Sequence, residues 1–296
     1  MKKIIVFLFL VLLLFGCGKK TDSPYIKSVK EFHTKRIERL KQPNSWLTLV
    51  GLYWLKEGKN SFGSDKSNDI VFPQSTSTKF IGNFTLSDTV VTVSIKEGVE
   101  IFHNDSIVTA LILQSDLSGK STILKHGSLS WYLIKRGDRF GIRLKDSESK
   151  LLKEFDDIDM FSIDQNWRIE AEFEEYDQPK EVDIPTAIGT IEKGTAHGKL
   201  KFNIDGTQLT LEPLGKADGL FLVFGDKTNG EETYGAGRFL IVDKPDSTGK
   251  IFIDFNKAYN PPCVFTKYAT CPLPAKENYL NTKITAGEKN FHSDYQ

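Results

Sequence analysis

The sequence predicts a mainly β protein, with a β-sandwich followed by a second β-rich sandwich or barrel and one N-terminal amphipathic helix. After residue 45, apolar residues come in short runs or alternate with polar ones, and no stretch shows convincing helical periodicity. Turns that contain glycine and aspartate separate these runs. The 296 residues, 39% of them hydrophobic, allow one large domain or two of moderate size.

The charge balance excludes several classes of protein. The 39 Lys and Arg residues match 39 Asp and Glu residues, which argues against the basic footprint of a nucleic-acid binder. Only 3 cysteines are present, so a disulfide-rich miniprotein is also excluded. No phosphate-binding glycine loop follows a strand and opens a helix, and we expect no cofactor.

The N-terminus is typical of an exported protein. Lys2 and Lys3 precede an unbroken apolar run of 12 residues, 4–15, which is shorter than the about 20 residues that span a bilayer as a helix. The Gly16-Cys17 pair that follows resembles a bacterial lipoprotein signal. That resemblance implies cleavage after residue 16 and a diacylglyceryl group, with palmitate, on Cys17. The alternative is an uncleaved anchor with an accidental cysteine.

We therefore expect residues 1–16 to be a signal peptide and residues 17–24 a lipidated tether. The lipid on Cys17 would attach the protein to a membrane of the bacterial cell envelope, facing the periplasm or the surface. Residues 25–41 then predict the amphipathic helix, with Ser23 as its cap and Pro24 at its first position. Its basic face could contact acidic lipid headgroups. Glu31 and Glu38 interrupt the positive charge, however, and favour a face that contacts water.

The strands are predicted in chain order. Residues 46–55 are apolar and aromatic, and apolar residues alternate with polar ones in 90–95. A hairpin turn at 136–138 connects the predicted strands 129–135 and 140–145. Residues 167–174 have one polar face, and 201–204 and 208–211 flank Asp205-Gly206. Three further strands follow at 219–224, 238–242 and 250–255. The acidic segment 153–165 suggests a boundary between a domain at 25–150, which includes the helix, and one at 165–296.

The first of these domains resembles forkhead-associated domains, which are β-sandwiches that bind phosphothreonine peptides. Gly63 and the run from Asn68 to Val71 match the signature loop of that family. Where the family places a phosphate-binding arginine, this chain has Ser64, and residues 75–82 contain no histidine. The resemblance therefore implies a sandwich scaffold, and we do not expect phosphopeptide binding.

Two longer passages resemble the bacterial family called domain of unknown function 1684. They are residues 46–55 (WLTLVGLYWL) and the motifs TYGAGRFL, DFNKAYNPPC, CPLP and AGEK between residues 233 and 289. The resemblance extends over nearly all of the chain after Cys17, and many members of the family look like lipoproteins. It implies an architecture but no activity, substrate or cofactor.

Polar residues are dense toward the C-terminus and form the candidate site. An arginine fork with carboxylates and amides is what a small anionic or polyhydroxylated ligand requires. The candidate binding or catalytic residues are Asp226, Tyr234, Arg238, Asp254, Asn256, Asn260 and Glu288. A structural alternative is a buried Arg238–Asp254 ion pair. Asp254, Asn256 and Glu288 lack the spacing of a calcium loop, so no metal is predicted.

Three functions remain open from sequence. The first is an envelope protein that binds a small polar ligand or a partner at this cluster. The second is a hydrolase with Asp254 or Glu288 as acid or base, although no nucleophile motif is present. The third is a structural docking protein without a ligand.

The two remaining cysteines, Cys263 and Cys271, are eight positions apart. In an extracytoplasmic compartment this spacing favours a disulfide, and the alternative is a pair of reduced, buried thiols. A zinc site is less favoured, because no histidine lies near them in the sequence.

Overall fold

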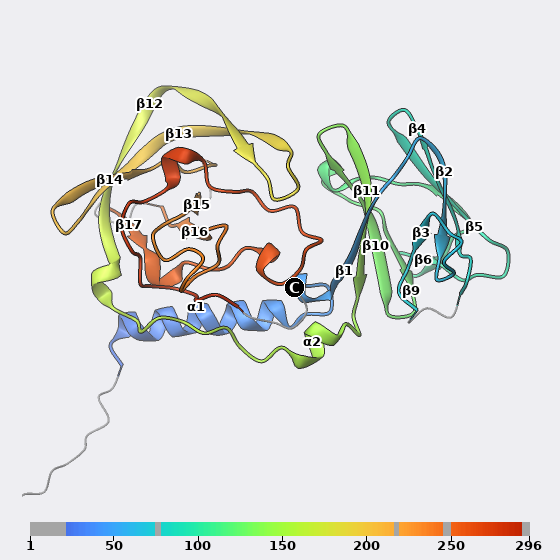
Figure 1. Ribbon diagram of the computed structural model, residues 1–296, viewed down its shortest axis with the longest axis horizontal. Helices are drawn as coiled ribbons and strands as arrows, with labels where there is room; N and C mark the ends of the chain where they lie inside the picture. The colour runs from blue at the N-terminus through green and yellow to red at the C-terminus, as the bar shows by residue number, and fades with distance from the viewer. Residues whose placement is uncertain (1–21, 75–77, 216–218, 245–249, 292–296) are drawn as a thin grey trace, which may run out of the picture.

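The computed structural model describes residues 22–74, 78–215, 219–244 and 250–291 (Figure 1). The predicted signal peptide, Cys17 and the start of the tether lie outside these residues. The described chain is mainly β with one long helix near its N-terminus, as the sequence predicts. Among the described helices, none combines the length and the hydropathy that crossing a membrane requires.

The N-terminal helix α1 (Pro24–Leu40) forms where the sequence places it. Ser23 Oγ accepts a hydrogen bond from the Ile26 N–H at 3.2 Å, and Pro24 takes the first position, where a missing N–H is harmless. Val29 and Leu40 are buried. Figure 1 shows α1 lying along the C-terminal half of the molecule rather than against the N-terminal sheets.

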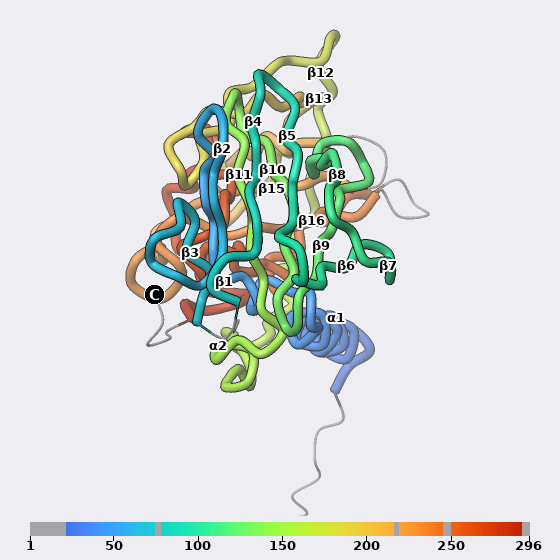
Figure 2. The backbone as a smooth tube through the Cα atoms, turned by 90° about the vertical axis from the view of Figure 1, so that its right-hand side faces the viewer, coloured from blue at the N-terminus to red at the C-terminus, as the bar shows by residue number. Residues whose placement is uncertain are grey.

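The N-terminal half is a sandwich of two sheets, and Figure 2 shows β2, β4 and β5 in front of β10 and β11. One sheet has the order β1-β11-β10-β9-β6-β7 and the other β3-β2-β4-β5-β8. The strands are β1 (Leu49–Trp54), β2 (Gly58–Gly63), β3 (Ile70–Val71), β4 (Gly82–Ser87), β5 (Val90–Ile95), β6 (Phe102–His103), β7 (Ser106–Ile107), β8 (Ala110–Ile112), β9 (Ile123–His126), β10 (Leu129–Arg136) and β11 (Arg139–Asp146).

Aromatic side chains fill the space between these sheets. The rings of Phe62 and Phe84 stack with centroids 4.1 Å apart, and Trp131 meets Phe62 edge-on at 5.9 Å. The predicted hairpin is the β10–β11 pair, and Gly137 takes the positive φ of 55° at its turn. The likeness of this half to forkhead-associated domains is not confirmed, and the Ser64 hydroxyl donates to the Thr78 carbonyl oxygen at 3.0 Å.

The C-terminal half contains a four-stranded sheet of order β14-β13-β12-β17 and the β15–β16 pair. Its strands are β12 (Arg168–Pro185), β13 (Ile191–Ile204), β14 (Thr207–Leu211), β15 (Leu220–Phe224), β16 (Arg238–Val242) and β17 (Ile251–Asp254). Residues 255–291 then wind over this half with only short 3-10 turns: η4 (Phe255–Lys257), η5 (Pro262–Val264) and η6 (Lys276–Asn278). Phe202, Phe224 and Phe255 pack in its core.

Most of the predicted strands are present, but several bounds differ. Residues 46–48 form a 3-10 turn instead of strand, and β13 begins at Ile191 rather than at residue 201. β12 continues to Pro185, well past the predicted end at residue 174, because it pairs with β13 as a long, largely exposed ribbon. The short helix α2 (Lys150–Glu154) follows the Ser149 cap and was not predicted, because five residues are too few to show a helical period. The domain boundary in residues 153–165 stays a prediction.

The two halves meet through a small apolar cluster. Leu49 of β1 packs with Val223, Phe239, Ala269 and Cys271, which all come from the C-terminal half. The Thr266 hydroxyl also donates to the Leu49 carbonyl oxygen at 3.2 Å. The turn η1 (Trp46–Thr48) links α1 to β1, and Trp46 packs against the same cluster. The passage 46–55 is therefore where the halves join.

Candidate functional site

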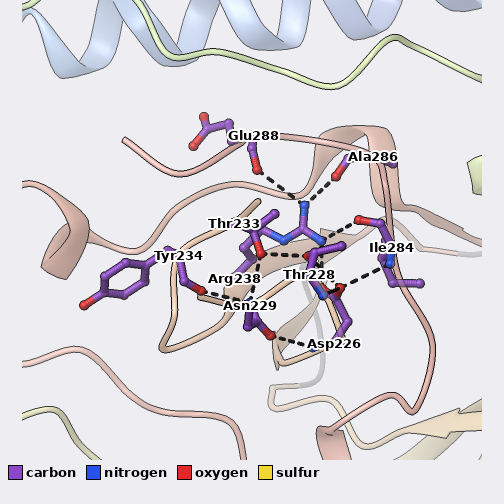
Figure 3. Close-up of polar contacts among 9 residues, drawn as sticks. All are labelled: Asp226, Thr228, Asn229, Thr233, Tyr234, Arg238, Ile284, Ala286 and Glu288. Atoms are coloured by element: carbon purple, nitrogen blue, oxygen red, sulfur yellow. Dashed lines mark hydrogen bonds and ion pairs between the residues drawn. The ribbon is translucent and has the colours of Figure 1, made fainter. Parts of the chain in front are cut away.

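Arg238, the predicted ligand contact, is fully buried at the start of β16 (Figure 3). Its Nη2 donates to Asp226 Oδ2 at 2.8 Å and to the Ile284 carbonyl oxygen at 2.9 Å, and its Nη1 donates to the Ala286 carbonyl oxygen. Burial lowers the pKa of the Arg238 guanidinium, and the charge of Asp226 opposes that shift. Arg238 thus pairs with Asp226, and the suggested pair with Asp254 is not formed.

Asp226 organises the loop between β15 and β16. Its Oδ1 accepts hydrogen bonds from the Thr228 N–H at 2.8 Å and the Ile284 N–H at 3.1 Å. Asn229 donates to the Tyr234 carbonyl oxygen at 2.8 Å, so the same network holds the backbone of Tyr234 (Figure 3). These contacts satisfy backbone groups inside the fold, which is a structural role.

Glu288 and Asn260 form a second network, directed toward α1. Glu288 is 1% exposed, and its carboxylate accepts from Arg36 Nε of α1 and from the Asn260 N–H at 2.7 Å. Arg36 Nη2 also donates to the Asn260 carbonyl oxygen at 2.8 Å. The Asn260 side-chain oxygen has no hydrogen-bond partner within the described residues. Glu288 therefore fixes the position and direction of Arg36.

Asp254 and Asn256 form a third network at the start of α1. The Tyr25 hydroxyl donates to Asp254 Oδ1 at 2.8 Å and accepts from Asn256 Nδ2 at 2.8 Å. Burial, and next the hydrogen bond to Asp254, raises the pKa of Tyr25. Asp254 ends β17, whereas Asn256 lies in η4, and Asn256 Nδ2 donates to Asp254 Oδ1 at 3.2 Å.

The predicted cluster is therefore divided among three networks and does not surround one pocket. The first two networks touch where Arg238 Nη1 donates to the Glu288 carbonyl oxygen at 3.4 Å (Figure 3). Two of the networks hold α1 against the C-terminal half, and the third holds the residue 226–238 loop. Within the described residues, no group of three or more His, Cys, Asp or Glu side chains is placed to bind a metal ion.

A solvent-open cleft lies beside these networks, where α1, η1 and β16 meet. It has a volume of about 480 Å³ and is lined by Phe32, Arg36, Arg39, Leu40, Ser45, Trp46, Ile241 and Tyr259. A smaller hollow shares Arg36, Trp46 and Tyr259 with it and reaches Asn260 and Pro262. The Arg36 guanidinium lies over the Tyr259 ring, 4.6 Å from its centroid. Asn260 is the predicted site residue that borders this hollow.

Two cationic side chains of β11 also lie near Trp46. The guanidinium of Arg143 lies 5.3 Å from the Trp46 ring centroid and the Lys145 ammonium 5.8 Å. Burial, with the neighbouring charge of Arg143, lowers the pKa of Lys145 to about 8. The surroundings of the cleft are therefore electropositive.

Sequence reasoning missed the cleft residues Arg36, Arg39, Trp46 and Tyr259. Trp46 and Tyr259 do lie in the two family-like passages, which was the available signal. The two arginines belong to the basic face of the helix, and the sequence predicts that this face contacts water. Their surroundings depend on β16 and Tyr259, about 200 residues further along the chain.

Cys263 and Cys271 are free thiols, and the structure does not show the predicted disulfide. The two residues are nonetheless in contact, because the Cys263 N–H donates to Cys271 Sγ at 3.1 Å. Cys263 is partly exposed, and Cys271 is 5% exposed.

Comparison with known proteins places this fold in a family. The family described as "Protein of unknown function (DUF1684)" matches residues 153–289, a range that includes the passage 233–289 but not 46–55. A solution NMR structure of an uncharacterized protein from Haloarcula marismortui is 34% identical, over 46% of this chain and 78% of that chain, with a TM-score of 0.39. No curated protein matches. The architecture is that of a mainly β protein whose C-terminal half is covered by a helix. Over residues 153–289, this chain belongs to the DUF1684 family.

Proposed function

We propose that this protein is a lipid-anchored protein of the bacterial cell envelope that binds a small anionic ligand with an apolar or aromatic part. The binding site is the cleft between α1, Trp46 and Tyr259. One observation carries the proposal: two arginines and three aromatic side chains line a single solvent-open cleft of about 480 Å³. Ligand sites of small molecules usually have about 300–1,000 Å³ and combine apolar walls with a few polar groups.

The two arginines have different roles in this proposal. Glu288 neutralises much of the charge of Arg36 and holds its guanidinium against Tyr259. Arg39 is exposed on the next turn of α1, and it forms no ion pair with any described carboxylate. Arg39 therefore supplies the free positive charge and the planar fork that a carboxylate or phosphate requires.

The apolar lining accommodates the remainder of the ligand. Phe32, Leu40 and Ile241 contribute aliphatic and aromatic surface, and the Trp46 and Tyr259 rings offer faces for stacking. A ligand with only a charged group would leave this surface exposed to water. The chemistry of the cleft thus favours an anion with an attached ring or chain.

The N-terminal sequence supports attachment to a membrane. The apolar run of residues 4–15 and the Gly16-Cys17 pair resemble a lipoprotein signal, and residues 18–23 alone separate Cys17 from the start of α1. A lipid on Cys17 would keep the start of α1 close to the membrane surface, and later residues of the same helix form one wall of the cleft.

Thermal unfolding with three probes tests the ligand class. Phenyl phosphate should raise the melting temperature, inorganic phosphate should raise it less, and benzylamine should leave it unchanged, because binding to the native state alone stabilises it. Arg39→Gln should abolish the effect of phenyl phosphate. The matched control is Lys35→Gln, because Lys35 is exposed on the same helix, pairs with Glu31 and does not line the cleft.

The proposal fails if phenyl phosphate does not stabilise the protein, or if Arg39→Gln responds as the native chain does. Equal stabilisation by benzylamine would exclude an anionic ligand.

A second experiment tests the anchor separately. Cys17→Ala should release the protein from membranes into the soluble envelope fraction, since a lipid on that sulfur is the proposed tether. Fractionation after a high-salt wash measures this. A variant that still sediments with membranes would contradict lipid anchoring but would leave the cleft proposal intact.

A further inference from the structure

The two C-terminal cysteines combine proximity with unequal exposure. Cys263 follows Pro262 at the edge of the hollow and is partly exposed, whereas Cys271 is buried in the apolar cluster between the halves. Their contact, 3.1 Å from the Cys263 nitrogen to Cys271 Sγ, brings the residues together without a bond between the sulfurs. Cys263 is thus the more exposed residue of the pair, and Cys271 is the more buried one.

A buried cation lies beside this pair. Arg143 is 3% exposed and forms no ion pair with a carboxylate in the part of the chain that the structure describes. Its Nη2 donates to Thr270 Oγ1 at 3.1 Å and its Nη1 to the Tyr132 hydroxyl at 3.3 Å, while its Nε has no partner among the described groups. Thr270 immediately precedes Cys271, so the uncompensated charge of Arg143 acts on the cysteine pair.

We propose that Cys263 and Cys271 form a thiol–disulfide exchange site, in which Cys263 is the attacking sulfur, Cys271 is the resolving sulfur and Arg143 is a positioning residue. The oxidant is an external disulfide, either a small molecule or a protein. This inference goes beyond ligand binding in the cleft and does not depend on it.

The chemistry balances in two exchange steps. The Cys263 thiolate attacks one sulfur of the external disulfide, forms a mixed disulfide and releases the other half as a thiolate. Cys271 then loses its proton and attacks Cys263 Sγ, which forms the Cys263–Cys271 bond and releases the second thiolate. The external disulfide is reduced by two electrons, and the two cysteines are oxidised by two.

The environment distinguishes the two sulfurs. A hydrogen bond from the Cys271 thiol is the main influence that lowers the pKa of Cys263, and the Arg143 charge adds to it. The same hydrogen bond, together with burial, raises the pKa of Cys271. Cys263 is therefore the more acidic thiol of the pair, and it is also the more exposed of the two. Both properties favour Cys263 as the sulfur that reacts first.

Trapping with oxidised glutathione tests the order of attack in the full chain. The native chain should gain a Cys263–Cys271 bond without a stable glutathione adduct. Cys271→Ser should instead keep one glutathione on Cys263, because the resolving sulfur is missing. Cys263→Ser should form its adduct on Cys271 at least tenfold more slowly. Peptide mapping by mass spectrometry assigns each adduct and separates both residues from Cys17.

Alkylation of Cys263 in the Cys271→Ser variant tests the role of Arg143. Arg143→Met should slow the reaction of Cys263 with iodoacetamide several-fold, and Arg143→Lys should restore most of the rate because the positive charge returns. Arg136→Met serves as a control, because Arg136 also donates to Thr270 but pairs with Asp116. Circular dichroism checks that each variant is folded.

Three results would overturn the proposal. The first is that both thiols of the native chain stay reduced in oxidised glutathione. The second is that Cys263 and Cys271 form adducts at equal rates in the single variants. The third is that a folded Arg143→Met variant is alkylated as fast as its parent. If Arg143→Met does not fold, the comparison of the two cysteine variants still decides the order of attack.

Discussion

The two halves of the molecule solve the problem of backbone hydrogen bonding in different ways. In the N-terminal half, neighbouring strands satisfy each other's backbone hydrogen bonds. Aromatic residues such as Phe62, Phe84 and Trp131 fill the space between the sheets. In the C-terminal half, residues 255–291 have only short 3-10 turns. There the Arg238 guanidinium binds the carbonyl oxygens of Ile284 and Ala286, as a neighbouring strand would. Irregular chain inside a fold needs buried polar side chains.

This comparison explains the polar residues that the sequence concentrates after residue 225. Asp226 and Arg238 stabilise chain segments that lack strand partners. This structural role explains why polar residues are dense there. It also predicts that the two halves respond to different kinds of substitution: the C-terminal half to lost hydrogen bonds and charges, and the N-terminal half to lost volume.

The largest effect is expected at Arg238. Arg238→Ala leaves the Asp226 carboxylate buried without its cation and removes the donors to two carbonyl oxygens, so the free energy of unfolding should fall by about 3–5 kcal/mol. Urea denaturation measures this. Lys250→Ala is the control, because the exposed pair with Glu170 contributes only about 0–1 kcal/mol. A loss at Arg238 as small as at Lys250 would refute the structural role.

A smaller loss is expected at Glu288. Glu288→Gln weakens charge-assisted bonds to Arg36 and the Asn260 N–H, and it should lower the free energy of unfolding by about 1.5–3 kcal/mol. It should also speed proteolytic cleavage within α1, because the clamp on that helix is loosened. Glu31→Gln, an exposed change on α1, is the control. Unchanged cleavage kinetics in Glu288→Gln would show that other contacts hold α1.

A volume change in the N-terminal core should cost less. Ile142→Val removes one buried methylene from β11 and should lower the free energy of unfolding by about 0.5–1.5 kcal/mol. Ile107→Val, at a position 56% exposed, should have almost no effect. Denaturation followed at several wavelengths measures both variants. A cost at Ile142 above that at Arg238 would reverse the comparison between the halves.

A pH dependence of stability is predicted at Lys145, where the halves meet. Its pKa is about 8 in the folded protein and about 10.4 in an unfolded chain, so between these values the unfolded state binds more protons. The contribution of Lys145 to the free energy of unfolding therefore increases as pH rises from 8 to about 10. Lys145→Met should flatten the stability curve in that range. A curve parallel to that of the native chain would contradict the lowered pKa.

The sequence predicted those parts of the fold that depend on neighbours in the chain. Ser23 and Pro24 indicate the start of α1, alternation predicts β5 at its observed bounds, and a short apolar run predicts β16. The hairpin at Gly137 follows from local turn chemistry in the same way. Periodicity and turn residues are sufficient where the interacting residues are close in sequence.

The candidate site was less predictable, because its contacts join distant residues. Asp226 and Asp254 were both plausible partners for Arg238, and only the tertiary fold selects Asp226. Arg36 belongs to a polar helix face that usually contacts water, and its role depends on Glu288, 252 positions later. The buried networks and the cleft therefore could not be located from sequence patterns.

The contacts of α1 also bear on the order in which the chain folds. Tyr25 reaches Asp254 across 229 positions and Arg36 reaches Glu288 across 252, so the first helix to be made is secured by nearly the last residues. The sandwich of residues 49–146 has its strand partners closer in sequence, so we expect it to form before α1 docks. Closing such long loops is slow relative to local pairing. A chain shortened before Glu288 would therefore lack the buried carboxylate that binds Arg36 of α1.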